Sequence, residues 1–232
     1  MTDTSHLLTK EAWRALFVQA MLALTVVLNI VNILALLAQG RLLSTVAGGG
    51  TISDEQAELN DNRIEMLNYI RIALLILSVI VWLAWMWRAY RNLQLVGSRQ
   101  TDTSPGWAVG YWFIPIINLY KPFQITKELW SRSAQGNHSG LDRDKPDASL
   151  VGIWWIVWII SSFFTRYAQR QSRGTETIAS LLSSNKELII SNVIGVLASV
   201  LAFAVVTRIH RYQQQLSIEP VPPETLSPAT PI

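Results

Sequence analysis

The sequence predicts an all-α integral membrane protein. It has four transmembrane helices, a short proline-broken segment that re-enters or partly spans the membrane, and an interfacial helix. Hydrophobic residues make up 50% of the 232 residues and charged residues 15%, against about 25% charged residues in ordinary soluble domains. Four long apolar runs carry no charge. A fifth run, 107–120, would rise only about 21 Å as a helix, too little for a hydrocarbon core of about 30 Å.

The first apolar run predicts a transmembrane helix over about 15–38, preceded by a cytoplasmic polar lead at 1–14. This run is longer than the apolar core of a signal peptide, which has about 7–15 residues, so we expect it to be retained as an anchor. Asn29 and Asn32 are three residues apart and therefore share a face. We interpret them as hydrogen-bonding side chains that join this helix to a neighbour, in preference to a ligand site.

The second span is predicted over about 70–87, at the end of a longer helix. Three glycines at 48–50 break the chain, and Ser53 with Gln56 forms a capping-box pattern that starts a helix near Asp54. The outer part of this helix is charged. Arg71 and Arg88 stand at the two ends of the apolar part, where long basic side chains can reach the membrane surface.

The central stretch, 105–122, is predicted to be broken at Pro115. Proline removes a backbone donor and disfavours helical geometry at the preceding residue, here Ile114. Because irregular backbone at membrane depth must be buried in protein or line water, we expect the other helices to surround this stretch. We expect the Asn118 amide to point into the bundle and donate to the freed carbonyls, with nearby tryptophan indoles as further donors. Pro122 suits the first turn of a new helix, an interfacial one over 122–133.

Two more spans are predicted over about 150–165 and 188–207, which gives a helical membrane domain over 15–211. A second capping-box pattern, Ser184 with Glu187, predicts the start of the last helix. Within that helix Ser191, Gly195 and Ser199 repeat every fourth residue, a stripe of small side chains that lets helix backbones approach closely. The tail at 212–232 is proline-rich and is predicted to be disordered.

The distribution of basic residues predicts that both termini are cytoplasmic. If the central stretch enters and leaves on one side, that side holds 12 of the 19 basic residues, whereas a full crossing would remove the bias. Cytoplasmic segments carry the excess of lysine and arginine. In this topology all ten tryptophans fall in the cytoplasmic half or near the middle of the membrane. The sequence leaves open whether they form a packed aromatic assembly around the central stretch or a one-sided interfacial belt.

Several motifs occur in an order that resembles a known family. They are WMWRAYRNL at 85–93, PGWAVGYWFIPIINLYKP at 105–122, KELW at 127–130, IWWIVW at 153–158 and VVTR at 205–208, with Gln213 beyond. The chain resembles, from its first span to its last, a bacterial membrane family catalogued as domain of unknown function 4328. The resemblance implies a small helical membrane domain and assigns no activity or catalytic residue.

No chemistry of a catalytic kind is predicted. There is no cysteine, no acidic residue or histidine within the four spans, and no catalytic or metal-binding motif. We therefore expect no enzyme activity, no metal and no cofactor, and the small net charge of +3 gives no reason to expect nucleic acid binding. A lipid-modifying enzyme is the last of the functions considered.

The remaining polar and aromatic features define a candidate cluster at the cytoplasmic face. Its members are Arg88, Arg91, Asn92, Trp107, Trp112, Pro115, Asn118, Lys121, Pro122, Glu128, Trp154 and Trp155. We predict a non-enzymatic module of the cell membrane that binds a partner protein or a lipid headgroup there, with membrane lipids and a homo-oligomer as further expected contacts. The alternatives are that these residues only anchor helix ends, or that the broken segment serves a small-solute channel or carrier.

Overall fold

A computed structural model describes residues 5–95, 102–135, 147–172 and 177–216, and every regular element in these ranges is helical. The α-helices are α1 (Ser5–Ala47), α2 (Asp54–Leu95), α3 (Pro105–Gly110), α4 (Lys121–Gln135), α5 (Ser149–Ser172) and α6 (Ile178–Leu216). Two single-turn 3-10 helices, η1 (Tyr111–Phe113) and η2 (Ile117–Leu119), lie between α3 and α4.

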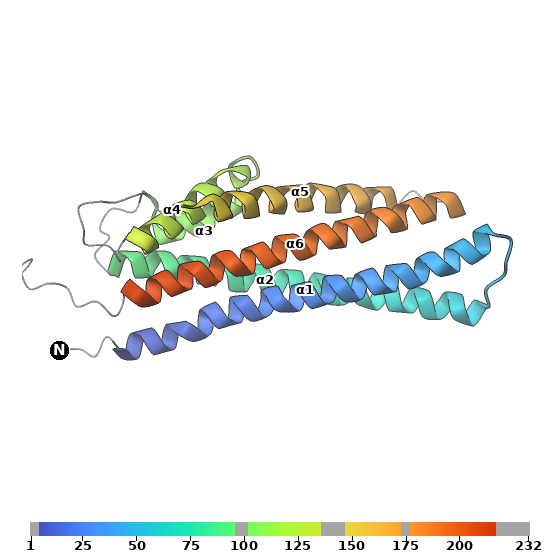
Figure 1. Cartoon of the computed structure of the whole chain (residues 1–232), viewed down its shortest axis with the longest axis horizontal. Helices are drawn as coiled ribbons and strands as arrows, with labels where there is room; N and C mark the ends of the chain where they lie inside the picture. The colour runs from blue at the N-terminus through green and yellow to red at the C-terminus, as the bar shows by residue number, and fades with distance from the viewer. Residues whose placement is uncertain (1–4, 96–101, 136–146, 173–176, 217–232) are drawn as a thin grey trace, which may run out of the picture.

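The four long helices lie along one another, and the two short ones are added at one end (Figure 1). We call α3, η1, η2 and α4 together the hairpin, and the end of the bundle where they lie the hairpin end. The hairpin end also holds the start of α1 and the last turns of α2 and α6. The turn between α1 and α2 lies at the opposite end. The pairs α1–α6, α5–α6 and α1–α2 make the main contacts between long helices, while α4 packs on α6, α5 and α2.

All four predicted spans are confirmed as helices long and apolar enough to cross a membrane. The helices are longer than the apolar runs. Residues 5–14, predicted as a polar lead, already belong to α1, and α6 continues to Leu216, past the predicted domain end at 211. The reason is that hydropathy marks only the part that suits hydrocarbon, whereas a helix continues wherever its backbone bonds are made. Most of the predicted tail, 217–232, lies outside the described residues.

The predicted start of α2 is confirmed. The backbone N–H of Ser53 donates to Gln56 Oε1 and the N–H of Gln56 donates to Ser53 Oγ, both at 3.2 Å. These are the two reciprocal bonds of a capping box. Just before it, Gly49 has φ 84°, in the left-handed region that glycine adopts at no steric cost. The chain therefore reverses between α1 and α2 as the glycines indicate.

The predicted start of the last helix is wrong. Ser184 lies buried inside α6, which begins six residues earlier at Ile178. The residues that cap it are Thr177 and Ser180: the N–H of Ser180 donates to Thr177 Oγ1 at 3.2 Å and the N–H of Thr177 donates to Ser180 Oγ at 3.1 Å. Serine replaces the glutamate or glutamine of the usual pattern, so the capping box at Ser184 and Glu187 was a false match inside a continuous helix.

The predicted break in the central stretch is present, but other helices do not surround it. Ser104 caps α3 by accepting from the N–H of Trp107, Pro105 occupies the first turn, and helical structure stops at Phe113, before Pro115. The chain resumes at η2 and then α4, with Pro122 in its first turn. Pro115 is exposed. The expectation of burial on all sides was wrong, because the central stretch packs against α2 and α5 on one side only and leaves residues 113–116 exposed.

Helix α4 is amphipathic as predicted, yet its apolar face packs on the bundle. Ile125, Leu129 and Trp130 are at most 3% exposed, while Gln124 and Lys127 lie on the exposed side. The buried face contacts α6, α5 and α2. An interfacial helix is expected to bury such a face in lipid, whereas here the apolar face of α4 is buried against the other helices.

The stripe on α6 faces other helices as predicted. A Cβ at Gly195 would lie 3.2 Å from Asn29 Oδ1 of α1. Ser191 is 3% exposed, and its hydroxyl lies 2.8 Å from that of Thr165 on α5. Ser199 bonds to the carbonyl of Gly195. Asn29 also packs here, but the amides of Asn29 and Asn32 donate to the carbonyls of Thr25 and Leu28 in their own helix, so the expected hydrogen bonds to a neighbouring helix are not seen in the described residues.

Candidate functional site

Six tryptophans form one packed cluster where the hairpin meets α2 and α5. Trp112 of η1 contacts the rings of Trp82, Trp155 and Trp158, with centroids 5.9–6.0 Å apart. Trp154 contacts Trp82 and Trp155, and Trp85 contacts Trp82. Most of these pairs are tilted or edge-to-face, the arrangements that aromatic quadrupoles favour. Of the two interpretations left open by the sequence, a packed aromatic assembly is present, but it lies against one side of the central stretch and does not surround it.

The backbone at the break is satisfied locally. The N–H of Asn118 donates to the carbonyl of Ile114 at 2.7 Å, and those of Leu119 and Tyr120 donate to Ile116 and Ile117 at 3.2 and 3.1 Å. The indole N–H of Trp155 donates to the carbonyl of Leu119 at 3.1 Å. The expected indole donor is thus present.

The Asn118 side chain does not have the role expected of it, the donation of hydrogen bonds to the carbonyls freed at the break. Its Oδ1 is buried and has no hydrogen-bond partner among the described residues. The side chain makes no hydrogen bond among the described residues, while the carbonyls of Ile114, Ile116, Ile117 and Leu119 next to the break accept from backbone N–H groups and from Trp155. Buried indole N–H groups of Trp82, Trp112 and Trp154 likewise lack partners in the described part of the chain. The cluster therefore holds by ring packing, with a single indole bond to the hairpin backbone.

Glu128 of α4 connects three segments of the chain. Its Oε1 accepts from the backbone N–H of Asp102 at 2.8 Å and lies 3.2 Å from Arg132 Nε. Its Oε2 lies 3.0 Å from the hydroxyl of Tyr90 on α2, which also lies 2.8 Å from the carbonyl of Ile125. The Glu128 side chain is 13% exposed and Tyr90 is fully buried. A carboxylate this buried is stabilised by its counter-ion and donors, so these bonds fix α4 against α2 and the start of the hairpin.

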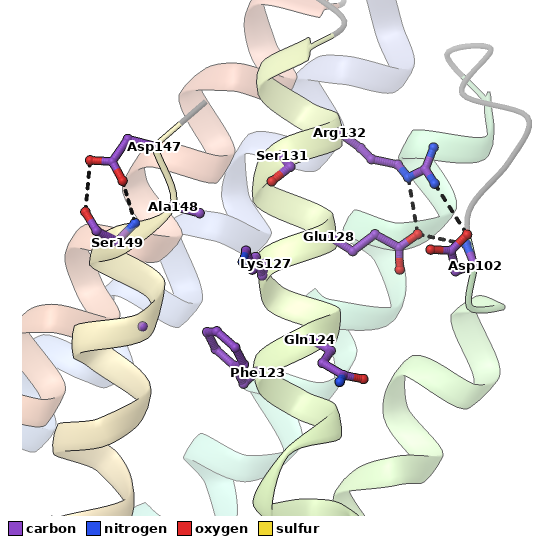
Figure 2. Close-up of a pocket in the computed structure, with 11 residues that line it drawn as sticks. Asp102, Phe123, Gln124, Lys127, Glu128, Ser131, Arg132, Asp147, Ala148 and Ser149 are labelled. Carbon is purple, nitrogen blue, oxygen red and sulfur yellow. Dashed lines mark hydrogen bonds and ion pairs between the residues drawn. The ribbon is translucent and has the colours of Figure 1, made fainter. Parts of the chain in front are cut away.

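A pocket of about 1000 Å³ surrounds α4 at this end. Its walls are Asp102, Phe123, Gln124, Lys127, Glu128, Ser131, Arg132, Asp147, Ala148, Ser149 and Gly152. Figure 2 shows Lys127 and Phe123 on the side of α4 that faces α5, and Glu128 with Arg132 on the side that faces Asp102. Arg132 also lies 3.6 Å from Asp102 Oδ1. The pocket thus presents charges of both signs, and Phe123 and Gly152 belong to its apolar lining.

Asp147 lines the pocket just before the start of α5. Its Oδ1 accepts from the backbone N–H of Ser149 at 2.8 Å and its Oδ2 accepts from the Ser149 hydroxyl at 2.9 Å. The bond from the backbone N–H, with that from the hydroxyl, lowers the pKa of this carboxyl below its usual range. Asp147 therefore stays ionised in the neutral range and belongs to the negative part of the lining.

The other predicted residues lie around these two features. Trp107 is 56% exposed and stacks on Tyr111, and the Lys121 ammonium lies 5.6 Å from the Tyr111 ring. Arg91 is exposed and lies over the Trp87 ring, while Arg88 and Asn92 are half-buried on α2. Only Glu128, of the twelve predicted cluster residues, lines the pocket. The predicted cluster is therefore an aromatic assembly beside a charged pocket, with basic residues at its edge.

Tyr90, Asp102 and Arg132 were missed as site residues. The spacing of Glu128 and Arg132, four apart on one helix, is a signal for an ion pair that could have found Arg132. Tyr90 had a weaker signal, since a buried tyrosine hydroxyl needs a partner. No signal in the sequence pointed to Asp102, because it meets Glu128 through a backbone N–H whose position only the fold determines. Among the described residues no group of three or more histidine, aspartate or glutamate side chains could hold a metal ion.

Comparison with known families gives one match. The model of the family described as "Domain of unknown function (DUF4328)" matches residues 49–211, more than half of the chain. The chain belongs to this family. The DUF4328 match includes α2, the hairpin, α5 and most of α6, and so contains both the tryptophan cluster and the pocket. It begins after α1, whereas the resemblance was expected to extend from the first span. No curated protein and no solved structure matches the chain.

Proposed function

We propose that this DUF4328 protein is a non-enzymatic module of the cell membrane that binds the polar headgroup of a phospholipid at its cytoplasmic face. The observation that carries the proposal is the pocket around α4, which opens at the hairpin end and is lined by both acidic and basic side chains. Its volume of about 1000 Å³ suits a headgroup, since small-molecule sites occupy roughly 300–1,000 Å³.

The charges of the pocket suit a ligand that carries both signs. The Lys127 ammonium is exposed, lies 5.8 Å from the Phe123 ring, and makes no ion pair within the described residues. It is therefore available to a phosphate. Asp147 and Glu128 supply negative charge on the two sides of α4 (Figure 2). A phospholipid whose headgroup combines a phosphate with an ammonium group matches this arrangement by charge complementarity.

The position of the pocket also suits a lipid. Phe123 faces Gly152 in the first turn of α5, and the apolar part of α5 begins at Leu150. The pocket is thus level with the boundary between hydrocarbon and water if α5 spans the membrane. The basic residues of the sequence favour the hairpin end as the cytoplasmic one. Basic side chains near that surface attract anionic lipid at about 1 kcal/mol each.

The tryptophan cluster weighs against the channel or carrier alternative. A solute pathway along the broken segment would need a hydrated route near Asn118. The rings of Trp82, Trp112, Trp154 and Trp155 occupy that region in continuous contact, and Asn118 Oδ1 is buried. An aromatic plug suits a static binding module better than a gate.

Native mass spectrometry of the protein extracted with its membrane lipids tests the proposal. We expect one or more retained phospholipids on the wild-type chain, and clearly fewer on the Lys127→Glu variant, because the reversed charge repels the phosphate. Arg14→Glu is the control with the same change of charge: Arg14 belongs to α1, which starts at the same end (Figure 1), and does not line the pocket, so its reversal should reduce lipid retention far less than Lys127→Glu.

Equal lipid retention by wild type and Lys127→Glu would overturn the headgroup assignment. Copurification of a protein that Lys127→Glu releases, with no lipid dependence, would indicate a partner protein as the ligand of this face instead.

A further inference from the structure

The turn of the α3–α4 hairpin exposes its apolar side chains outward. We call residues 113–120 the apex. Phe113 is 68% exposed and Ile116 is 77% exposed, and Ile114 and Pro115 are exposed beside them. In Figure 1 the apex projects from the bundle beside α5, while the two chain ends of the hairpin return to the hairpin end. Such a group of exposed apolar residues requires a partner, because soluble surfaces rarely leave one uncovered.

Contacts with α5 fix how far the apex reaches. The indole of Trp155 bonds to Leu119, and Trp112 packs on both Trp155 and Trp158. Trp155 and Trp158 are six and nine residues beyond the first residue of α5, Ser149, which corresponds to about 9–14 Å along the helix. Half of the hydrocarbon core is about 15 Å thick. The apex therefore ends before the middle of a membrane that α5 spans.

The backbone of the apex tolerates lipid. Four of its carbonyls, those of Ile114, Ile116, Ile117 and Leu119, accept hydrogen bonds from N–H groups of the chain. The Tyr120 carbonyl accepts from the N–H of Gln124 at 3.2 Å. Pro115 has no N–H that would need an acceptor. Unsatisfied backbone groups cost several kcal/mol each in hydrocarbon, and the hydrogen bonds to five of the eight apex carbonyls reduce that cost.

The exposed surface of the apex continues that of its neighbours. The side of α5 that is open to the surroundings is apolar at Ile153, Ile156 and Ile160, each 50–60% exposed. Because α5 is one of the four helices suited to cross a membrane, this side faces acyl chains. The apex, bonded to α5 through Trp155, faces the same environment.

We infer that the α3–α4 hairpin inserts into only one leaflet, the one at the hairpin end, where its apex packs against phospholipid acyl chains. One leaflet then contains six α-helical segments and the other contains four. The protein is wider in the first leaflet. This inference concerns the apex and acyl chains, so it does not depend on the proposed headgroup pocket around α4.

Site-directed spin labelling tests the insertion directly, because the chain contains no native cysteine. A nitroxide is attached at Ile116→Cys in the full chain reconstituted into phosphatidylcholine vesicles, and its accessibility to oxygen and to a water-soluble nickel chelate is measured. Phe113→Cys is a second site; both side chains are exposed, so labelling leaves the core intact. Ile80→Cys on the exposed, apolar side of α2 is the mid-membrane reference, and Ser53→Cys in the exposed turn is the aqueous reference.

We expect both apex labels to favour oxygen over the nickel chelate, as Ile80 does, and to lie at a shallower depth than Ile80. Apex labels as accessible to the chelate as Ser53 would place the hairpin in water and overturn the inference. Labels closed to both reagents would show that protein, such as a second copy, covers the apex, and would also overturn it.

Discussion

Two interfaces of this bundle bring helices together by opposite means. Between α1 and α6 the contact relies on small side chains and amides: the Asn29 amide lies against Gly195, and the Asn185 amide donates to the carbonyl of Leu36 at 2.9 Å. Between α2, the hairpin and α5 it relies on large rings, with Trp112 and Trp154 at the centre. The second interface gathers six tryptophans, packed with other apolar side chains such as Met86 and Leu93.

The difference follows from the length of the elements. Two long helices can approach along many turns, and in lipid such approach gains from van der Waals contact and interhelical hydrogen bonds, which small residues permit. The hairpin is too short to continue alongside α2 and α5, so the space between them is filled by bulky side chains. Tryptophan fills the most volume per residue and buries roughly 150–250 Å². A single chain thus uses close approach where helices are complete and aromatic filling where one is interrupted.

The first test breaks the small-residue interface. Gly195→Leu places a branched side chain where even a Cβ lies 3.2 Å from Asn29 Oδ1, so α1 and α6 must separate. We expect the free energy of unfolding in detergent to fall by about 1–3 kcal/mol, the usual cost of overpacking. The measurement is denaturant or thermal unfolding followed by circular dichroism.

The matched control enlarges a side chain on the open face of the same helix. Val200→Leu, at a position 50% exposed, should change stability by less than about 0.5 kcal/mol, as surface substitutions usually do. Equal effects of the two substitutions would show that close approach at Gly195 does not hold α6 against α1.

The sequence was informative where one property of a local segment decides the structure. Hydropathy alone found the four spans, and Pro115 alone found the break. The Ser53 capping box was found for the same reason, since both of its bonds lie within four residues. The Ser184 box failed because the same pattern can occur inside a long helix, where tertiary packing and not the cap decides the boundary.

The candidate site was only partly predictable because its bonds join distant segments. The sequence marked Glu128 and Trp155 as candidates, but not that Glu128 would meet Tyr90 and Asp102, or that Trp155 would bond to Leu119. These contacts connect residues 26–38 positions apart. Asn118 makes none of the side-chain bonds expected of it among the described residues, while Trp155, 36 residues away, supplies an indole donor to the Leu119 carbonyl.

The second test concerns the only indole bond from the aromatic cluster to the hairpin backbone seen in the described residues. Trp155→Phe removes the N–H that donates to the Leu119 carbonyl and keeps a ring in the cluster. We expect a loss of about 1–2 kcal/mol in the free energy of unfolding, since a buried acceptor then lacks a partner. Trp158→Phe is the control: Trp158 stacks on Trp155 with centroids 4.8 Å apart, and its indole makes no hydrogen bond within the described residues.

Both substitutions remove the same atoms, so a larger loss at Trp155 reflects its hydrogen bond together with the deeper burial of its ring. A loss for Trp158→Phe as large as that for Trp155→Phe would show that ring packing alone, without the bond to Leu119, attaches the hairpin to α5.

The smallest expected effect carries the most information about function. Asn118→Leu removes a buried Oδ1 that has no partner among the described residues, and a buried polar group without a partner costs about 1–3 kcal/mol. If Asn118 had the role expected from the sequence, bonding the freed carbonyls, its loss would destabilise the protein. Because the Asn118 side chain makes no hydrogen bond with the described residues, we expect no loss, and a gain of up to about 1 kcal/mol as leucine replaces the unpaired amide. Unfolding of the purified variant in detergent measures the sign of this change.

Asn29→Leu is the contrasting substitution, because Asn29 donates to the Thr25 carbonyl at 2.8 Å and its Oδ1 packs on Gly195. At that position the same change should destabilise the protein. A destabilised Asn118→Leu would show that the Asn118 amide has a partner in the membrane, a water or a ligand, and would reopen the hydrated pathway that the tryptophan cluster argues against.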